Sequence, residues 1–375
     1  MSFQETLSDY QGFDFDRFFA GVSDADVERS LAKESLGATD FLTLLSPRAG
    51  DYLEAIAQGA QQLTVQHFGR TIQMFIPLYL SNHCNNRCSY CGFNVTNKIQ
   101  RHVLSLEEIE REAEAIARTG MQHVLILTGE DCRATPIEYL CDAVAVLKRY
   151  FASVSIEIYP LHTEEYAQLK ASGVDGMTVF QETYDPAVYK SVHLGGKKRD
   201  FAWRLDAPAR AAEAGLRTVN IGPLLGLAEP RREMFFTGLH ARFLETNFLQ
   251  TEVAVSLPRI NEAEGGFSAT QHVGDRLFVQ LMTALRVFLP RAAITLSTRE
   301  RAEFRDRLLT LGATRFSAGS STGVGGYAIP IKQQTQRGES ALQFEITDER
   351  SVGEVAAAIV ARRYQPVFKD WEAAL

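Results

Sequence analysis

Short runs of β-branched and aromatic residues alternate along the chain with longer amphipathic stretches, from about residue 73 to residue 318. A polar turn follows each run, and the apolar residues of the next stretch recur at helical spacing. The pattern therefore predicts eight strands, each followed by a helix. The predicted strands cover residues 72–80, 123–128, 154–160, 176–181, 217–222, 252–258, 293–297 and 314–319.

Helix-start and helix-stop signals support this alternation. Ser105 and Glu108 have the spacing of a capping box ahead of an amphipathic stretch. Gly120, Gly173 and Gly215 each follow a helical stretch, where a left-handed terminal residue is favoured. Eight strand-and-helix units in roughly 250 residues match a (β/α)8 barrel, whereas a doubly wound sheet usually has fewer strands. We therefore predict an α/β fold, a TIM-type barrel that is closed or slightly open.

The segments on either side of the barrel are predicted to be extensions of one compact domain. Residues 1–70 are amphipathic and predict an N-terminal helical extension that packs on the barrel, which spans residues 71–330. Residues 331–375 predict a polar segment followed by a C-terminal helix and tail. The chain shows no internal repeat of 20–50 residues beyond the strand and helix alternation, and no low-complexity tract.

Composition and charge narrow the class of function. The 375 residues include 39 Lys and Arg against 46 Asp and Glu, a formal net charge of −7, with no basic block. This balance offers no electrostatic footprint for nucleic acid or for an anionic membrane. No apolar run approaches the roughly 20 residues that span a bilayer, and the first residues lack the pattern of a secretory signal. We therefore expect a cytoplasmic protein that acts on a small molecule.

The active site of such a barrel lies at the carboxyl ends of its strands, so residues that follow a predicted strand are the candidates for the site. Glu157 ends the third predicted strand and alternates with isoleucines. Because a carboxylate is not buried unpaired in an apolar layer, we expect Glu157 at the mouth of the barrel. Arg299 follows the seventh strand and offers a bidentate fork for a carboxylate. The alternative for Arg299 is a helix-opening salt bridge to Glu300 or Glu303.

Three of the five cysteines, Cys84, Cys88 and Cys91, fall within eight residues directly after the first predicted strand. In a reducing cytoplasm such a set predicts a metal or redox centre better than a disulfide framework. Thiolates select zinc or iron–sulfur clusters. Structural zinc needs a fourth ligand, for which His83 and His102 are near. A [4Fe–4S] cluster held by three cysteines leaves one iron open, and the place of the triplet after the first strand favours it.

The segment Cys84–Phe93 resembles the CxxxCxxC signature of the radical S-adenosylmethionine (SAM) superfamily, including the aromatic residue before the last cysteine. The resemblance continues over essentially the whole chain. It is similar to the 2-iminoacetate synthases, the tyrosine lyases of thiamine biosynthesis. The phrases that carry this similarity are PLYLSNHC, CGF, LILTGED, VFQETYD, HLGGKKRDFAWRL, IGPLLGL, LSTRE and PVFKDW, in this order.

The resemblance implies a reaction and its partners. Such an enzyme cleaves the Cα–Cβ bond of L-tyrosine to 2-iminoacetate (dehydroglycine) and p-cresol, and SAM is reduced to 5′-deoxyadenosine and methionine. The imine supplies the thiazole moiety of thiamine. The implied partners are thiazole synthase, as recipient of the imine, and an electron donor of the flavodoxin or ferredoxin type.

The resemblance also assigns candidate site residues. The three cysteines are the implied ligands of a [4Fe–4S] cluster whose fourth iron is left to the amino and carboxylate groups of SAM. The implied SAM contacts lie beside the cysteine loop and at strand ends, and they are Tyr90, Gly129, Glu130, Glu157 and Glu182. The implied substrate contacts, which we count as catalytic, are Tyr79, Arg299 and Ser317.

Further features concern the alternative function, the pocket wall and the protein surface. Another radical SAM enzyme, of the menaquinone, deazaflavin or tryptophan-lyase type, is the alternative function. The tyrosine-cleaving maturase of [FeFe]-hydrogenase has a C-terminal extension with a second cysteine-bound cluster, whereas no cysteine follows Cys141 here. Asn261 and Glu262 stand where relatives often have Arg-Pro, in the expected pocket wall. The basic run 197–199 is expected to be a solvated surface feature.

Overall fold

The computed structural model describes residues 2–261, 266–329 and 341–369. Within these ranges nine strands form one sheet in the order β2-β3-β4-β5-β6-β7-β8-β1-β9. Each pairs in parallel with its neighbours, and eight of them correspond to the eight predicted strands. These eight are β1 (Thr71–Ser81), β2 (His123–Thr128), β3 (Ser153–Glu157), β4 (Gly176–Glu182), β5 (Thr218–Pro223), β6 (Glu252–Ser256), β7 (Ala293–Leu296) and β8 (Arg315–Ser317).

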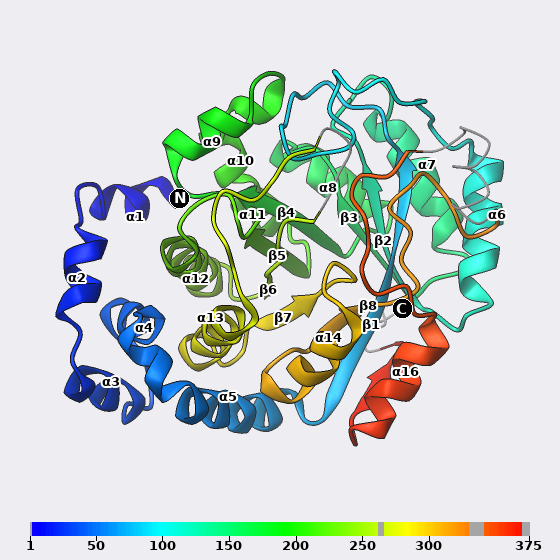
Figure 1. The fold of residues 1–375 in the computed structure, drawn as a ribbon. Coiled ribbons are helices and arrows are strands. Elements are labelled where there is room, and N and C mark those ends of the chain that lie inside the picture. Colours follow the sequence, from blue (N-terminus) through cyan, green and yellow to red (C-terminus); the bar gives the residue numbers. More distant parts are fainter. Residues whose placement is uncertain (1, 262–265, 330–340, 370–375) are drawn as a thin grey trace.

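Strand β1 closes the sheet into a barrel because it pairs with both β8 and β2. Its residues Gln73–Phe75 pair with β8, and its residues from Ile76 to Ser81 pair with β2. Figure 1 shows the strands in the centre of the molecule with helices around them. The predicted TIM-type barrel is confirmed, and it is closed.

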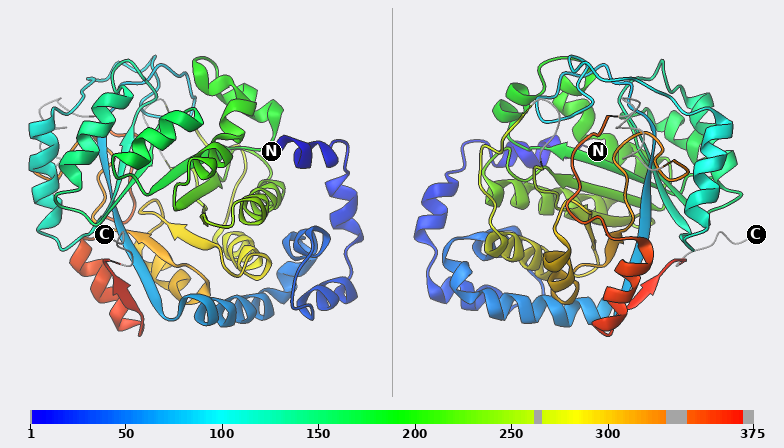
Figure 2. Two further views of the ribbon diagram at one scale, coloured as in Figure 1. Left: turned by 180° about the vertical axis from the view of Figure 1, so that it is seen from behind. Right: turned by 45° about the vertical axis from the view of Figure 1, so that its right-hand side comes forward.

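The helices between the strands pack around the outside of the barrel (Figures 1 and 2). The predicted capping box is present: the Glu108 N–H donates to Ser105 Oγ at 3.2 Å, and the Ser105 N–H donates to the Glu108 carboxylate at 2.7 Å. The outer helices are α6 (Leu106–Ala117), α7 (Ile137–Leu147), α8 (Thr163–Ala171), α9 (Pro186–Val192), α10 (Phe201–Leu205), α11 (Ala207–Glu213), α12 (Pro230–Asn247), α13 (Asp275–Phe288) and α14 (Ala302–Leu308), with the 3-10 helices η2 (Lys197–Arg199) and η3 (Leu309–Leu311).

Before β1 the chain forms a row of helices along one side of the barrel, drawn in blue in Figure 1. The ring of Phe41 is buried and stacks on Phe288 of α13, with centroids 4.2 Å apart. Phe3 stacks in the same way on His240 of α12, at 4.3 Å. These contacts join the row to the main core. The row consists of α1 (Gln4–Asp9), α2 (Phe15–Gly21), α3 (Asp24–Leu31), α4 (Ala38–Leu45), η1 (Arg48–Tyr52) and α5 (Leu53–Phe68).

The C-terminal part of the chain ends beside the start of β1. Helix α16 (Val352–Ala361) precedes β9 (Gln365–Val367), which pairs with Thr71–Gln73 at the start of β1 (Figure 2, red). The sequence pattern does not predict this ninth strand, because three residues with a central proline carry no period-2 signal. The last two residues of the phrase PVFKDW, Asp370 and Trp371, lie outside the described residues.

Alternation along β3 directs its side chains in turn to the apolar outer layer and to the interior of the barrel. Ile156 of β3 and Ile158 just after it belong to the main apolar cluster beneath the helices, whereas Ser155 and Glu157 face the inside of the barrel. Glu157 therefore lies on the inner side of β3, where it lines the pocket. Within the described ranges, no helix combines the length and apolar character needed to cross a membrane.

Candidate active site

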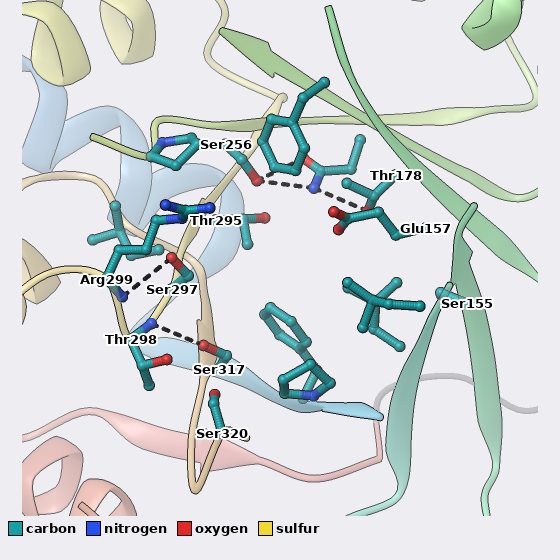
Figure 3. Close-up of a pocket in the computed structure, with 18 of the residues that line it drawn as sticks. Ser155, Glu157, Thr178, Ser256, Thr295, Ser297, Thr298, Arg299, Ser317 and Ser320 are labelled. Atoms are coloured by element: carbon teal, nitrogen blue, oxygen red, sulfur yellow. Dashed lines mark hydrogen bonds between the residues drawn. The ribbon is translucent and has the colours of Figure 1, made fainter. Parts of the chain in front are cut away.

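A pocket occupies the interior of the barrel and reaches the carboxyl ends of its strands (Figure 3). The Asn220 amide nitrogen donates to Ser256 Oγ at 2.9 Å and to Thr178 Oγ1 at 3.2 Å, which ties three strands together from inside. Gln73 and His123 line the opposite end, near the start of the strands. Bulky side chains fill this space in a typical TIM barrel. Here small polar residues share the lining with bulky apolar ones such as Phe75, Leu125 and Met177. The small polar residues include Ser155, Thr178, Asn220, Ser256, Thr295 and Ser317.

The three clustered cysteines lie on the loop that leaves β1, at the rim of this pocket. Cys91 lines the pocket, and both Cys84 and Cys91 pack against a small apolar cluster that contains Tyr79. Cys88 is buried, and all five cysteines of the chain are free thiols. Among the residues that the structure describes, no three His, Cys, Asp or Glu side chains are arranged around a single metal ion.

Burial controls the protonation of these thiols. It raises the pKa of Cys84 and Cys88 above the ordinary thiol value and that of Cys91 to about 11. The nearby Lys198 ammonium opposes this rise at each of the three. Coordination to a metal deprotonates a thiol outright and reverses the preference. Three soft sulfur donors on one loop therefore fit an iron–sulfur cluster. The cluster and its thiolate ligands carry a negative charge, which the nearby Lys198 ammonium would stabilise.

A buried network of ion pairs holds the cysteine loop against the barrel. The side-chain amide of Asn86 donates to Glu130 Oε2 at 2.8 Å, and Arg204 Nη1 donates to Glu130 Oε1 at 2.7 Å. Asn86 Oδ1 in turn accepts from the backbone N–H of Lys198 at 3.0 Å. Burial opposes ionisation of Glu130, but the charges of Arg204 and Lys198 outweigh it and lower the pKa of Glu130. Both carboxylate oxygens of Glu130 thus have partners within the protein.

Gly129 lets the end of β2 approach the cysteine loop closely. Its N–H donates to the carbonyl of Ser81 at 2.9 Å. A Cβ atom at this position would lie 2.2 Å from the carbonyl oxygen of His83 and 3.1 Å from Cβ of Cys84. No side chain fits in that space, so this glycine fixes the point where the chain enters the loop.

Two carboxylates, Glu157 and Glu182, enter the pocket from neighbouring strands. Burial, and secondarily the charge of Glu182, raises the pKa of Glu157 to about 7, against the opposing charge of Arg299. Glu182 sits at an irregularity in the β4–β5 pairing with a positive φ of 71°. Bulges of this kind re-aim side chains near active sites. Its Oε1 accepts from Lys198 Nζ at 2.7 Å, so Glu182 is ion-paired whereas no ion pair is formed by Glu157 among the described residues.

Tyr90, between the second and third cysteines, lines the pocket with its ring. Its hydroxyl lies 2.8 Å from Nε2 of His193, and Nδ1 of His193 lies 2.8 Å from the carbonyl of Tyr189. Burial lowers the pKa of His193 to about 3, so the ring is neutral. A neutral imidazole that donates through Nδ1 accepts at Nε2, so the Tyr90 hydroxyl is the donor.

Two of the three candidate substrate contacts, Arg299 and Ser317, lie across the pocket from Glu157 (Figure 3), and the third, Tyr79, lines the same pocket. Ser317 Oγ accepts from the Thr298 N–H at 3.1 Å. The Tyr79 hydroxyl donates to Gln343 Oε1 at 2.6 Å, and burial raises its pKa. The Arg299 guanidinium lies 3.3 Å from the ring centroid of Phe344, and burial lowers its pKa.

The alternative reading of Arg299 as a helix-opening salt bridge is wrong. The carboxylate of Glu300 binds Arg259 instead, with Arg259 Nε donating to Glu300 Oε1 at 2.8 Å. Among the described residues, no hydrogen bond or salt bridge engages the Arg299 guanidinium. The cation therefore remains available to an anion in the pocket.

The structure brings most of the sequence-predicted residues to one cavity and leaves the others beside it. Cys84, Cys88, Gly129 and Glu130 form the adjoining layer behind the rim, and they do not line the pocket within the described ranges. The predicted residues that line it are Tyr79, Tyr90, Cys91, Glu157, Glu182, Arg299 and Ser317.

Several pocket residues are missed by reasoning from the sequence. The expectation of a solvated basic run is wrong for Lys198. Its side chain is only 11% exposed and is paired with Glu182, because the short helix η2 turns it inward while Lys197 and Arg199 stay exposed. The phrase HLGGKKRDFAWRL was the available signal for Lys198. Gln343 and Phe344 follow the barrel on a segment without a motif. Asn261 lines the pocket as expected of that wall, and Glu262 lies outside the described residues.

Two family models match successive parts of the chain. The Radical SAM superfamily model matches residues 78–236, which include the cysteine loop and the strands from β2 to β5. The Biotin and Thiamin Synthesis associated domain model matches residues 256–365, which include Arg299, Ser317 and Phe344. The two matches meet at the pocket, whose lining comes from both.

Whole-chain relatives settle the family. The chain is 41% identical to the 2-iminoacetate synthase of Escherichia coli K12 over 356 residues, 95% of this chain and 93% of that protein. It is 40% identical to the 2-iminoacetate synthase of Salmonella typhimurium, over 94% of this chain and 92% of that protein. The chain belongs to the 2-iminoacetate synthases, radical SAM enzymes of thiamine biosynthesis. The resemblance seen in the sequence is thereby confirmed.

Solved structures agree with this membership. The [FeFe]-hydrogenase maturase HydG from Carboxydothermus hydrogenoformans superposes with a TM-score of 0.89 and 31% identity, over 99% of this chain and 86% of that one. Methylornithine synthase, PylB, superposes with a TM-score of 0.70 and 21% identity, over 91% of this chain and 97% of that one, and so shares the fold. The barrel of this chain is thus shared with both of these solved proteins.

Proposed function

We propose that this chain cleaves the Cα–Cβ bond of L-tyrosine to 2-iminoacetate and, after uptake of one electron and one proton, p-cresol. SAM is the co-substrate and leaves as 5′-deoxyadenosine and methionine, and the imine supplies the thiazole moiety of thiamine. The observation that carries the proposal is one pocket whose lining includes both Cys91 of the cysteine loop and Arg299, a guanidinium without a hydrogen bond or salt bridge among the described residues. An amino-acid carboxylate bound at Arg299 is held within the same cavity as the loop.

Cys84, Cys88 and Cys91 would hold three irons of a [4Fe–4S] cluster, and the fourth iron would take the amino and carboxylate groups of SAM. When bound, this pair of groups supplies the 5′-deoxyadenosyl radical that removes a hydrogen atom from the tyrosine amino group. The protein's task is then to position one N–H bond and to exclude water and other C–H bonds. The closed barrel and its lining are suited to that task.

The candidate SAM contacts divide into two kinds. Tyr90, Glu157 and Glu182 line the pocket and would touch SAM directly, with the Glu157 carboxylate accepting from the ribose hydroxyls. Gly129 and Glu130 lie behind the rim. The carbonyl at Gly129 and the carboxylate of Glu130 stay candidates for the SAM ammonium, and the contacts of Glu130 with Arg204 and Asn86 support a role in holding the loop as well.

The substrate contacts each keep a free hydrogen-bonding group toward the pocket. Ser317 Oγ accepts from the backbone, so its O–H is left to donate to a carboxylate oxygen. Tyr79 donates its own hydrogen to Gln343, so its oxygen can accept from the substrate ammonium. Arg299 supplies paired N–H donors in one plane, which match the two oxygens of a carboxylate. Together these three would bind the α-amino acid group.

The proposed partners follow from the chemistry of the product and of the cofactor. The imine hydrolyses readily, so direct delivery to thiazole synthase would protect it. A one-electron donor of the flavodoxin or ferredoxin type would reduce the cluster. Both partners are inferred from the family's pathway.

The deciding experiment is an anaerobic incubation of the reconstituted protein with SAM, a chemical reductant and tyrosine. Mass spectrometry should detect 5′-deoxyadenosine together with p-cresol. 5′-Deoxyadenosine without p-cresol would point to the alternative, a radical SAM enzyme of the menaquinone, deazaflavin or tryptophan-lyase type. Replacement of tyrosine by tryptophan provides the direct comparison with the tryptophan lyases.

The matched control for the cluster compares two cysteines. Cys88→Ala removes one of the three loop thiols and should abolish formation of both products. Cys132→Ala removes an exposed thiol outside the loop and should leave both unchanged. Undiminished activity in Cys88→Ala would contradict the assignment of the cluster to this loop.

A further inference from the structure

Residues 341–348, here called the closing segment, run across the mouth of the pocket and bond to several parts of its rim. The carbonyl of Gln343 accepts from the N–H of Gly92 at 3.0 Å, and the Gln343 N–H donates to the carbonyl of Thr322 at 3.0 Å. The N–H of Thr347 donates to the carbonyl of Thr298 at 2.9 Å. The closing segment thus connects the residue that follows the last cysteine of the loop to the stretch that carries Arg299.

The approach of the closing segment to the cysteine loop is close. A Cβ atom on Gly92 would lie 2.3 Å from the carbonyl oxygen of Leu342 and 2.9 Å from that of Gln343. Both contacts involve backbone atoms, which cannot rotate away as a side chain can. Gly92 is therefore needed for this connection, and the closing segment is held in register with the loop.

Phe344 in this segment supports the Arg299 side chain. The guanidinium carbon lies 3.3 Å from the centroid of the Phe344 ring, close enough for a stacked cation–π contact. The Arg299 backbone is fixed as well, because its carbonyl accepts from Asn261 Nδ2 at 3.0 Å and its N–H donates to Ser297 Oγ at 3.4 Å. Within the described residues, Phe344 is what restrains the otherwise rotatable end of the side chain.

Phe344 does not behave as an ordinary core residue. It is half-buried and belongs to none of the apolar clusters found among the described residues, although it lines the pocket. Its ring contact is with a cation. Because the N–H donors of a guanidinium lie in the plane of the group, a ring stacked on one face leaves the donor edges open.

We propose that Phe344 is a positioning residue: its ring fixes the guanidinium plane of Arg299 so that two N–H donors face the substrate carboxylate. This inference rests on the proposed function, in which Arg299 binds that carboxylate. The stacked ring belongs to the residue directly after Gln343, which bonds to Gly92, so the carboxylate is held at a fixed offset from the cysteine loop. The placement of the reacting amino group depends on that offset.

The test compares Phe344→Leu, which keeps apolar volume but removes the ring face, with Phe344→Tyr, which keeps the ring. The probes are tyrosine and tyramine, which lacks the carboxylate. Their dissociation constants are measured by equilibrium dialysis on the reconstituted, SAM-loaded protein. We expect Phe344→Leu to weaken tyrosine binding about tenfold and tyramine binding less than twofold. Phe344→Tyr should stay within about twofold of the wild type for both.

The ratio of the two products formed during turnover is a second measurement, and a loss of packing alone would not change it. In Phe344→Leu the ratio of p-cresol to 5′-deoxyadenosine should fall to below about half of the wild-type ratio, because a misplaced substrate lets SAM cleavage proceed without bond cleavage. In an Arg299→Gln background the Leu and Phe forms should have equal tyrosine affinities, since the ring then has no cation to position.

Three outcomes would overturn the proposal. The first is the same preference for tyrosine over tyramine in Phe344→Leu and Phe344→Tyr. The second is an undiminished loss of tyrosine affinity when Phe344→Leu is made in the Arg299→Gln background. The third is an unchanged ratio of p-cresol to 5′-deoxyadenosine in Phe344→Leu. Iron content and thermal melting show whether a variant has folded. If Phe344→Leu fails to fold, Phe344→Tyr is compared with Arg299→Gln instead. If the wild type forms no p-cresol, the proposed function fails, and the two binding constants still decide the role of Phe344.

Discussion

Three polar side chains of the pocket wall are each fixed by one partner in the scaffold. Ser317 is fixed by a backbone N–H, Tyr79 by Gln343 and Glu182 by Lys198. Glu157 differs, because among the described residues no cation forms an ion pair with it. An ionised carboxylate in that setting destabilises the folded protein until a ligand donates to it.

This exception predicts a pH-dependent stability. The pKa of Glu157 is about 7 in the folded protein and 4.5 as the ordinary value. The folded state therefore keeps the proton where the unfolded state has lost it, so this contribution is full below about pH 4.5 and is lost as the pH rises through about 7. Glu157→Gln removes this titration. The stability of the variant relative to the wild type, both without ligand, should therefore be greater at pH 8 than at pH 5 by about 2.5 kcal/mol.

The measurement is urea unfolding of the wild type and Glu157→Gln at pH 5 and pH 8. Glu354→Gln provides a control, because Glu354 is an exposed capping residue of α16 whose pKa is lowered by Ser351 and so lies below this window. A pH-independent difference between the wild type and Glu157→Gln would show that the carboxyl titrates normally in the folded state.

The residues found from the sequence share one property: each sits at the end of a strand or in a motif. Glu157, Arg299 and Ser317 are of this kind, and the structure places all three in the pocket. Lys198 and Phe344 are not, since their inward positions depend on a short 3-10 helix and on a segment that returns from far along the chain. Such positions depend on tertiary packing, which the local sequence pattern does not predict.

At the level of elements, the junction between β2 and the cysteine loop has no spare space. Gly129→Ala would place a Cβ 2.2 Å from the carbonyl oxygen of His83, a backbone atom at the start of the loop. We expect the loop to shift and cluster retention to fall, with iron and sulfide content reduced to less than about half of the wild type.

The control for Gly129→Ala is Gly353→Ala in helix α16. A Cβ at Gly353 meets nothing within 4 Å, and helical alanine is favoured over glycine by roughly 1 kcal/mol. This variant should keep full iron content and melt at the same temperature or slightly higher. Equal iron content in the two variants, measured after identical anaerobic reconstitution, would show that the junction tolerates a side chain.

The elements themselves differ in how far the sequence predicts them. The strands from β1 to β8 are visible because β-branched and aromatic runs recur with polar turns between them. Strand β9 has three residues and the closing segment has no regular structure, so neither has a periodic signal. Their positions come from pairing with β1 and from bonds to Gly92 and Thr298, contacts between residues that lie far apart in the sequence.

At the scale of the molecule, the N-terminal helices and the barrel share one apolar core. Phe41 stacks on Phe288, and a Cβ on Gly238 of α12 would lie 2.3 Å from the Phe41 ring. Phe41→Ala leaves a cavity between α4 and the barrel helices that the surroundings cannot easily fill. The free energy of unfolding should fall by about 3–5 kcal/mol.

Denaturant unfolding of Phe41→Ala, followed by circular dichroism and by tryptophan fluorescence, checks this value. Because the core is shared, both signals should move together to lower denaturant in a single transition. Phe13→Ala is the comparison, since Phe13 is 39% exposed on the same row of helices. A separate early transition in Phe41→Ala would mean that the helical row unfolds independently of the barrel.

The small polar residues of the pocket lining lie apart from the main apolar core. That core is formed by the outer faces of the strands and their helices, while serines, threonines and Asn220 make up part of the cavity lining inside. Exchanging one small polar lining residue for another leaves the outer core untouched. Selection can therefore reshape the cavity for a different amino acid at little cost in folding, which makes this architecture a ready starting point for new radical chemistries.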